Sequence, residues 1–136
     1  MIYITSSNIN EYMKYDDDLA YLVYMDIEKM GNFIWFQSLG EFIRIPIYLP
    51  SIYPGTSPSE DVKKKAREMV GQTIYIFNQT SEEIAISTYS PISGVPGDSS
   101  TSFLIEHGQV AILSCKMGFA NGTECVYWTR EIGNYV

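Results

Sequence analysis

The chain has 136 residues, of which 46% are hydrophobic and only 18% are charged, and its net charge is -7 at pH 7. This length and hydrophobic content suit one domain with a real core and exclude an intrinsically disordered chain. The negative charge, with a pI of about 4.5, disfavours nucleic acid as a partner because its phosphates would be repelled. The low charged fraction indicates apolar surface that a partner would cover.

The first eighteen residues are interpreted as a loop or an assembly arm. Residues 5–10 are turn-like, and Asp16, Asp17 and Asp18 form an acidic cluster. Consecutive aspartates lack the alternating spacing of a calcium loop, so a solvated loop is favoured. Residues 1–4 are too short for a signal segment, and no apolar run is long enough for a membrane span, so membrane insertion is not expected.

The first strands are expected within residues 19–56. Residues 21–27 and 33–36 are rich in β-branched and aromatic side chains, and the turn at 30–32 predicts that they form a hairpin. A further strand is expected at 43–49, where aliphatic residues alternate. Pro46 removes a backbone donor, so this strand is placed at a sheet edge or at a bulge.

One helix is predicted at 57–70. Ser57 is the expected N-cap, Pro58 the first helical residue and Glu60 the N3 partner of a capping box. An apolar stripe follows at Val62, Ala66, Met69 and Val70. Gly71 suits the position after the helix. The Lys and Arg residues of this helix are interpreted as a solvated face.

Residues 71–136 carry most of the information. Short apolar strands recur at 71–78, 84–88, 102–105 and 109–115, with turn-forming residues between them and a long Pro- and Gly-containing loop at 89–100. This spacing predicts one mainly β domain over residues 1–136, a small antiparallel β-sandwich or barrel with about eight strands and one short helix.

The two cysteines do not define a disulfide framework. If residues 109–115 and 124–130 pair across the loop 116–124, Cys115 and Cys125 would lie opposite each other. Two free buried thiols are nevertheless favoured over a disulfide, because nothing in the sequence indicates secretion.

Catalytic and metal-binding chemistry finds no support in the sequence. The single histidine, His107, lies in a predicted turn, where an exposed structural role is favoured over that of a general base. One His and two Cys are too few for a His/Cys metal site, and no nucleophile, phosphate-binding or dinucleotide motif is present. We therefore expect no enzyme activity, no catalytic residues, no metal and no cofactor.

Several segments resemble the β-modules of tailed-bacteriophage head fibres and tail fibres, and in particular those of gut Bacteroidales phages. The matching residues are 71–78, 84–86, 102–105, 108–115 and 126–128, with a looser match at 43–50. The resemblance covers about the last half of the chain. It implies a virion surface protein, usually a homo-oligomer, that decorates the particle or contacts the host or its glycans, and it implies no catalytic residues.

Three functions remain open. The first is a non-enzymatic virion fibre or decoration module, a homodimer or homotrimer that contacts other virion proteins. The second is a bacterial extracellular or cell-surface carbohydrate-binding or adhesin-like domain, with Trp35 and Trp128 as candidate sugar platforms. Because each tryptophan lies within a strand pattern, packing in the core or in an interface is favoured over a platform for both. The third is a small β-barrel enzyme. Host-surface glycans are a further candidate partner under the first function. Aromatic residues of the strands, and Tyr89 at the start of the loop 89–100, are the candidates for the binding or interface surface: Tyr24, Trp35, Tyr75, Phe77, Tyr89 and Trp128.

Overall fold

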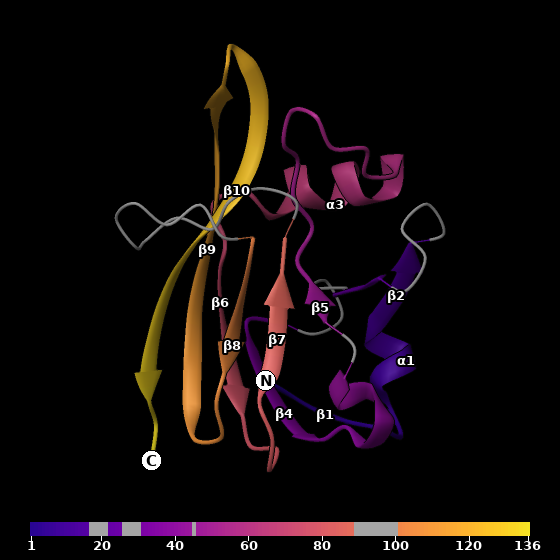
Figure 1. Cartoon of the computed structure of the whole chain (residues 1–136), viewed down its shortest axis with the longest axis vertical. Helices are drawn as coiled ribbons and strands as arrows, with labels where there is room; N and C mark the ends of the chain where they lie inside the picture. The colour runs from indigo at the N-terminus through magenta and orange to yellow at the C-terminus, as the bar shows by residue number, and fades with distance from the viewer. Residues whose placement is uncertain (17–21, 26–30, 45, 89–100) are drawn as a thin grey trace.

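The structure is a computed structural model that describes residues 1–16, 22–25, 31–44, 46–88 and 101–136, with the backbone alone at 13–16, 22–25, 42 and 44. The chain is mainly β and builds two five-stranded sheets that do not close into a barrel (Figure 1), which confirms the predicted class. The elements in chain order are β1 (Ile2–Thr5), α1 (Ile9–Tyr12), β2 (Met13–Asp16), β3 (Leu22–Met25), β4 (Phe33–Ser38), the 3₁₀ helix η2 (Gly40–Arg44), β5 (Ile47–Tyr48), α3 (Glu60–Met69), β6 (Thr73–Asn78), β7 (Ile84–Ser87), β8 (Ser102–Ile105), β9 (Gln109–Ala120) and β10 (Thr123–Asn134).

The chain passes back and forth between the two sheets. Sheet A has the strand order β1-β4-β6-β9-β10, and sheet B has the order β2-β3-β5-β7-β8. Every connection from β3 to β7 changes sheet, so β4 pairs in parallel with β1 and β6, and β5 pairs in parallel with β3 and β7. Strands that return to a sheet after a crossing run in the same direction. Both sheets are therefore mixed, whereas purely antiparallel sheets were expected.

The predicted hairpin of 21–27 with 33–36 is wrong for the same reason. β3 belongs to sheet B, where it pairs with β2 and β5, while β4 belongs to sheet A. Gly31 does adopt a left-handed conformation with φ 71°, but it lies just before β4, at the end of the connection between the two sheets, and not in a two-residue hairpin turn.

The predicted strand at 43–49 is much shorter in the structure. Gly40, with φ 56°, begins the 3₁₀ helix η2, which extends to Arg44, and only Ile47 and Tyr48 pair as β5. Ile45 lies outside the described residues. The alternation still holds where the strand exists, because Ile47 and Leu49 are buried.

The helix α3 forms within the predicted range, but Ser59 is its N-cap instead of Ser57. Ser59 is extended (φ -63°, ψ 162°), and its Oγ accepts the Val62 N–H at 3.3 Å. Glu60 is consequently the first helical residue, and the predicted capping box does not form. The predicted stripe is confirmed at Val62, Ala66 and Met69, which are buried. Val70 is the C-cap, and Gly71 follows it with φ 89°, as predicted.

This geometry predicts unequal effects for the two serines. Ser59→Ala should lower the free energy of unfolding by about 1 kcal/mol, because it leaves an N-terminal N–H of the helix without its acceptor. Ser57→Ala, two residues earlier at an exposed position, is the matched control and should be nearly neutral. Urea denaturation of both variants tests the assignment, and a larger loss for Ser57→Ala would contradict it.

The pairing considered between residues 109–115 and 124–130 is present in the structure, as part of the longer hairpin of β9 and β10. Asn121 (φ 52°) and Gly122 (φ 78°) occupy the turn, as in a type I′ hairpin. Residues 116–120, predicted as loop, are paired strand, and the far end of the hairpin projects beyond the other strands (Figure 1). Cys115 lies opposite Trp128 and Cys125 lies opposite Gly118, so the two thiols are not cross-strand partners.

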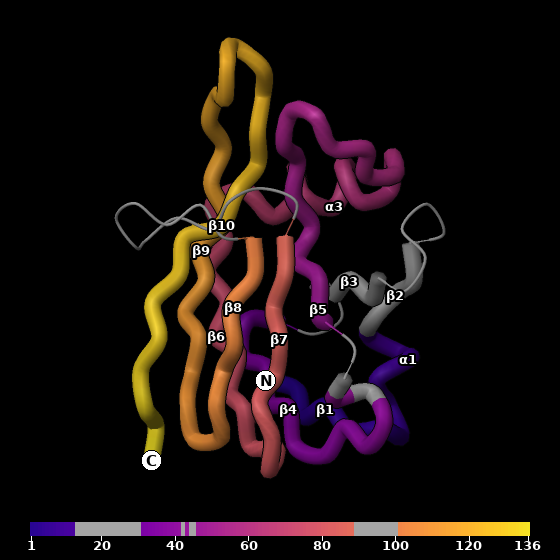
Figure 2. The backbone as a smooth tube through the Cα atoms, in the orientation of Figure 1, coloured from indigo at the N-terminus to yellow at the C-terminus, as the bar shows by residue number. Residues whose placement is uncertain are grey.

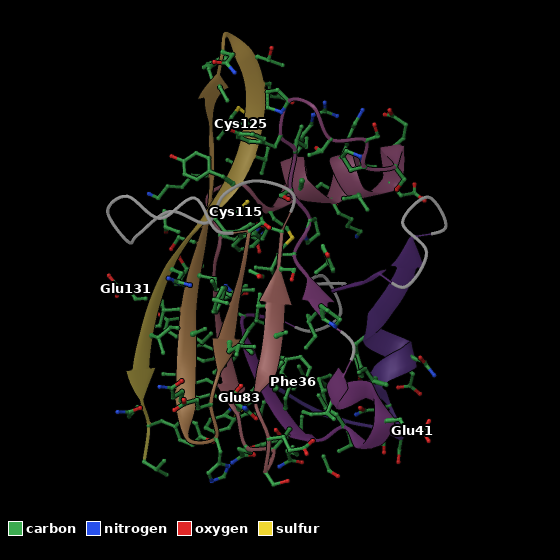
Figure 3. The ribbon with its side chains drawn as sticks, in the orientation of Figure 1. Phe36, Glu41, Glu83, Cys115, Cys125 and Glu131 are labelled. Atoms are coloured by element: carbon green, nitrogen blue, oxygen red, sulfur yellow. The ribbon has the colours of Figure 1, made fainter. Side chains whose placement is uncertain are left out.

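The core lies between the two sheets and under α3. In sheet A, Ile34, Phe36, Ile74, Ile76 and Leu113 point inward and are fully buried. They pack against Ile84, Ile86 and Phe103 of sheet B, and Ala66 and Met69 of α3 join the same cluster. Phe36, which Figure 3 marks within the sandwich, and Trp128 of β10 are the large aromatic side chains among these mostly aliphatic inward rows. The alternate residues of these strands form the opposite face of the sheet.

Candidate interaction surface

Three of the six predicted interface residues meet on one surface. Trp35, Tyr75 and Phe77 lie on the outer face of sheet A, which points away from sheet B. Trp128 is fully buried in the core, so its predicted place on a binding surface is wrong. The side chain of Tyr24 and the whole of Tyr89 lie outside the described residues.

The outer face of sheet A carries two cross-strand rows of apolar side chains, which we call the aromatic face. The strand register aligns the first row from β1 to β9 and the second from β4 to β9. The first row is Tyr3, Trp35, Phe77 and Val110, and the second row is Phe33, Tyr75 and Ile112. On β10 the rows end at Gly133 and Glu131, respectively. A monomeric sandwich usually presents polar residues on such an outward face.

The rings of the aromatic face stack on one another along the rows. The centroids of Trp35 and Phe77 are 3.8 Å apart with planes 6° from parallel, and those of Phe33 and Tyr75 are 4.8 Å apart at 8°. Tyr135 packs edge-on against Trp35 and Phe77 at 5.3 and 5.5 Å. These contacts hold the rings in a fixed, fairly flat layer, because each ring restricts its neighbours.

The C-terminal Tyr135 closes one end of this layer. Its hydroxyl donates to the Asn78 backbone oxygen at 2.8 Å, and its backbone N–H donates to Gly108 O at 3.0 Å. Burial raises the pKa of the Tyr135 hydroxyl, which therefore stays protonated as a donor. Tyr135 is thus fixed by two hydrogen bonds and packs against the rings of the aromatic face.

The aromatic face is partly exposed and has a buried donor that lacks an acceptor. Tyr3 and Phe33 are each 46% exposed, and the other rings are partly covered by their neighbours. Trp35 Nε1 is buried and has no hydrogen-bond partner among the described residues. Such a group carries a desolvation cost. Contiguous exposed aromatic surface of this kind marks interaction sites.

Polar residues border the aromatic face on both sides. Thr73, Ser114 and Thr129 align beyond the second row, and the Thr73 and Ser114 hydroxyls are 3.0 Å apart. Beyond the first row, Gln37 Nε2 donates to Gln79 Oε1 at 3.1 Å. An apolar centre with a polar rim is the usual anatomy of a protein interface.

The candidate catalytic histidine has a structural role in the described part of the chain. His107 Nδ1 lies 2.7 Å from the Thr80 carbonyl oxygen. A carbonyl oxygen only accepts, so this nitrogen carries the proton. No group of three or more His, Cys, Asp or Glu side chains in the described residues is arranged to hold a metal ion. A depression of about 330 Å³ between Gln37–Gly40 and Thr80–Glu82 has Glu82 at its wall, with Glu41 in the adjoining hollow. The described residues that line it include no cationic side chain and no nucleophile–base pair.

The two thiols are free and buried. Figure 3 shows Cys115 midway along the β9–β10 hairpin and Cys125 farther toward its tip. Burial raises the pKa of the Cys115 thiol to about 12. The thiol therefore stays protonated at neutral pH and is not a nucleophile.

Comparisons with protein-family models, with curated proteins and with solved structures found no match to this chain. The resemblance to phage fibre modules therefore stays a prediction from the sequence. Among the helices of the described residues, none has the length and apolar character needed to cross a membrane.

Proposed function

We propose that this protein is a non-enzymatic assembly module that associates with a second copy of itself through the aromatic face. The observation that supports this most strongly is the pair of ordered apolar rows on an outer sheet face, where a monomer would carry polar residues. The resemblance of the sequence to fibre modules favours a virion surface as the place of assembly. Other virion proteins and host glycans are further proposed partners in that setting.

The arrangement of the rings favours a protein partner over a sugar. A sugar platform needs an aromatic ring with one broad face open to solvent. Trp35 has Phe77 stacked on it, with Tyr135 against the edge of the pair. Trp128, the other tryptophan, is in the core. A flat layer of mutually packed rings instead matches the inner face of a sheet-on-sheet contact.

The aromatic face is complementary to itself. Its β1 and β4 side carries Tyr3, Trp35 and Phe33, whereas its β9 and β10 side carries the smaller Val110, Ile112 and Gly133, with Glu131 at the outer margin. A two-fold axis along β6 would place the large rings of one copy over the small residues of the other. Closed two-fold contacts of this type are the commonest in homo-oligomers.

The size of the aromatic face sets the expected affinity. Five strands spaced about 4.8 Å apart and about six residues long give a footprint of roughly 400 Å². A standard interface buries about 800 Å² per partner, so the contact is expected to be weak. The net charge of -7 on each copy also opposes association. We therefore expect a dissociation constant in the micromolar range.

Variants at the exposed margin of the face test the proposal. Tyr3→Ser combined with Phe33→Ser removes two rings that are each 46% exposed, so the core remains intact. Dimerisation should weaken at least tenfold, because the aromatic anchors of an interface carry most of its binding energy. Leu104→Ser removes a 53% exposed side chain from sheet B and is the matched control. Equal dimerisation of both variants would contradict the proposal.

The carbohydrate-binding function makes a different prediction for the same variants. The wild type would be a monomer at all concentrations, and glycan binding would be lost in the Tyr3/Phe33 double variant. A glycan array run with the Tyr3→Ser/Phe33→Ser variant and with the Leu104→Ser control separates the two functions. A monomeric wild type whose glycan binding is lost only in Tyr3→Ser/Phe33→Ser would overturn self-association.

A further inference from the structure

β10 is an open edge of sheet A. It is the last strand in the order β1-β4-β6-β9-β10 and lies at the outer margin of the molecule in Figures 1 and 2. It has 12 residues, while β1 at the opposite edge has four. Glu131, Ile132, Gly133 and Asn134 are all exposed. A strand this long offers a row of backbone donors and acceptors to any extended chain that meets it.

The hydrogen bonds of β10 show which backbone groups point outward. Val126 exchanges two backbone hydrogen bonds with Ile52, which lies on the side away from β9. Tyr135 N–H bonds to Gly108 O, on the β9 side. Because backbone groups alternate along a strand, Ile132 and Asn134 point outward like Val126. No backbone partner of Ile132 or Asn134 is found on that side in the described part of the chain.

This end of the edge lacks the strongest protections against pairing. Proline is absent from β10, and the bridge to Ile52 covers only the start of the strand. The charged residues Arg130 and Glu131 would disfavour any strand pairing that places a residue of the same charge directly opposite one of them. Figure 3 shows Glu131 pointing away from the sheet at the outer margin. In the part of the chain that the structure describes, no strand pairs with the Ile132–Asn134 end of this edge, and the charges of the strand favour some registers over others.

We propose that β10 pairs with β10 of a second copy, antiparallel and across a two-fold axis at Ile132. The outward groups of Ile132 would then exchange two backbone hydrogen bonds with Ile132 of the other copy. In this register Glu131 faces Gly133 and Arg130 faces Asn134, so no like charges oppose each other. Moving the axis one residue toward the N-terminus places Glu131 opposite Glu131, and moving it two residues places Arg130 opposite Arg130. Moving the axis toward the C-terminus shortens the paired segment, because β10 ends at Asn134. Like charges directly opposite each other destabilise a strand pair.

The edge contact joins two copies of sheet A into one continuous sheet. The first row of one copy, which ends at Gly133, would continue into the second row of the other, which begins at Glu131. The aromatic faces of the two copies would form one surface of twice the area. The edge contact uses backbone groups and the face contact uses side chains, so each contact can be tested without the other.

Cysteine crosslinking in the Tyr3→Ser/Phe33→Ser background tests the edge contact alone. Ile132→Cys should form a disulfide-linked dimer under mild oxidation, because residues directly opposite in a sheet have Cα atoms about 5.5 Å apart. Asn134→Cys is the matched control and should not crosslink, since its symmetry mate is displaced along the strand. Crosslinking by Glu131→Cys or Arg130→Cys instead of Ile132→Cys would overturn the register. Crosslinking by none of the four would overturn the contact.

A proline variant tests the backbone donor directly. Ile132→Pro removes the outward N–H and should reduce edge dimerisation at least tenfold, while Ile132→Thr keeps the N–H and should dimerise like the parent. Thermal melts of both monomers check that the fold is retained. If Ile132→Pro does not fold, the cysteine series decides. If Tyr3→Ser/Phe33→Ser associates more weakly than the wild type and Ile132→Cys still crosslinks in that background, the two contacts are both present and separate. The crosslink without any effect of Tyr3→Ser/Phe33→Ser supports the edge alone.

Discussion

Trp128→Ala is expected to lower the free energy of unfolding by about 4 kcal/mol, the largest effect of any single substitution considered. Trp128 is fully buried and is the largest side chain in the core. Its Nε1–H donates to the Pro50 carbonyl oxygen at 2.9 Å and so ties β10 to the segment before α3. The alanine variant leaves a cavity and a buried carbonyl without its donor. Urea denaturation followed by tyrosine fluorescence or circular dichroism measures the loss.

Trp128→Phe separates the two contributions to this loss. The phenyl ring fills most of the space but provides no donor for Pro50, so the loss should be about 1–2 kcal/mol. A Trp128→Ala protein with wild-type stability would contradict the core assignment. Such a result would instead support an exposed Trp128 that can bind a ligand.

Asn78→Ala is expected to cost about 3–4 kcal/mol, because a single buried amide satisfies several backbone groups. Asn78 Nδ2 donates to Ile105 O at 2.7 Å and to Glu82 O at 2.8 Å. Its Oδ1 accepts from the Thr80 N–H at 2.8 Å and from the Thr80 hydroxyl at 2.6 Å. This network joins the end of β6 to the β7 turn and to β8, and so connects the two sheets.

Asn8 is the matched control for Asn78, because it has the same chemistry at a less buried position. Asn8 Oδ1 accepts the Thr5 N–H and its Nδ2 donates to Tyr3 O, both at 2.8 Å. Water can replace these bonds, so Asn8→Ala should cost about 1 kcal/mol. Chemical denaturation of both variants gives the comparison, and equal losses would contradict the role assigned to burial.

The sequence predicts those parts of the fold that depend on neighbours in the chain. The helix stripe at Val62, Ala66 and Met69 and the left-handed Gly71 follow from local rules. The N-cap residue was not predicted correctly. Ser57 and Ser59 are each followed by residues that can form the first turn of a helix, and the tertiary structure decides between them. The β9–β10 hairpin was predictable because its strands are adjacent in the chain.

The pairing of the earlier strands was not predictable by the same rules. β3 and β4 are close in sequence and have hairpin-like composition, yet they belong to different sheets. Long-range parallel pairings decide where they lie, and nothing local encodes these pairings. The prediction of a strand at 43–49 was wrong because the 3₁₀ helix Gly40–Arg44 includes the first residues of this range, so only Ile47 and Tyr48 form a strand.

The candidate surface was predictable in part. Trp35, Tyr75 and Phe77 belong to strands that are apolar on both faces, and this signal is independent of the pairing partner. Tyr3 and Tyr135 were missed because they lie at the chain ends, where the period-two signal is short. Trp128 was misplaced because a single strand does not reveal which of its two apolar faces is covered.

Sedimentation equilibrium of the wild-type protein over a dilution series from about 200 to 1 µM tests self-association most directly. The monomer mass is 15.4 kDa. We predict a concentration-dependent mass that reaches at least the dimer value at the high end and falls toward the monomer on dilution, and a rise in association with added salt as the repulsion between the acidic copies is screened. A constant monomer mass over the whole series, at low and high salt, would contradict the proposed assembly function.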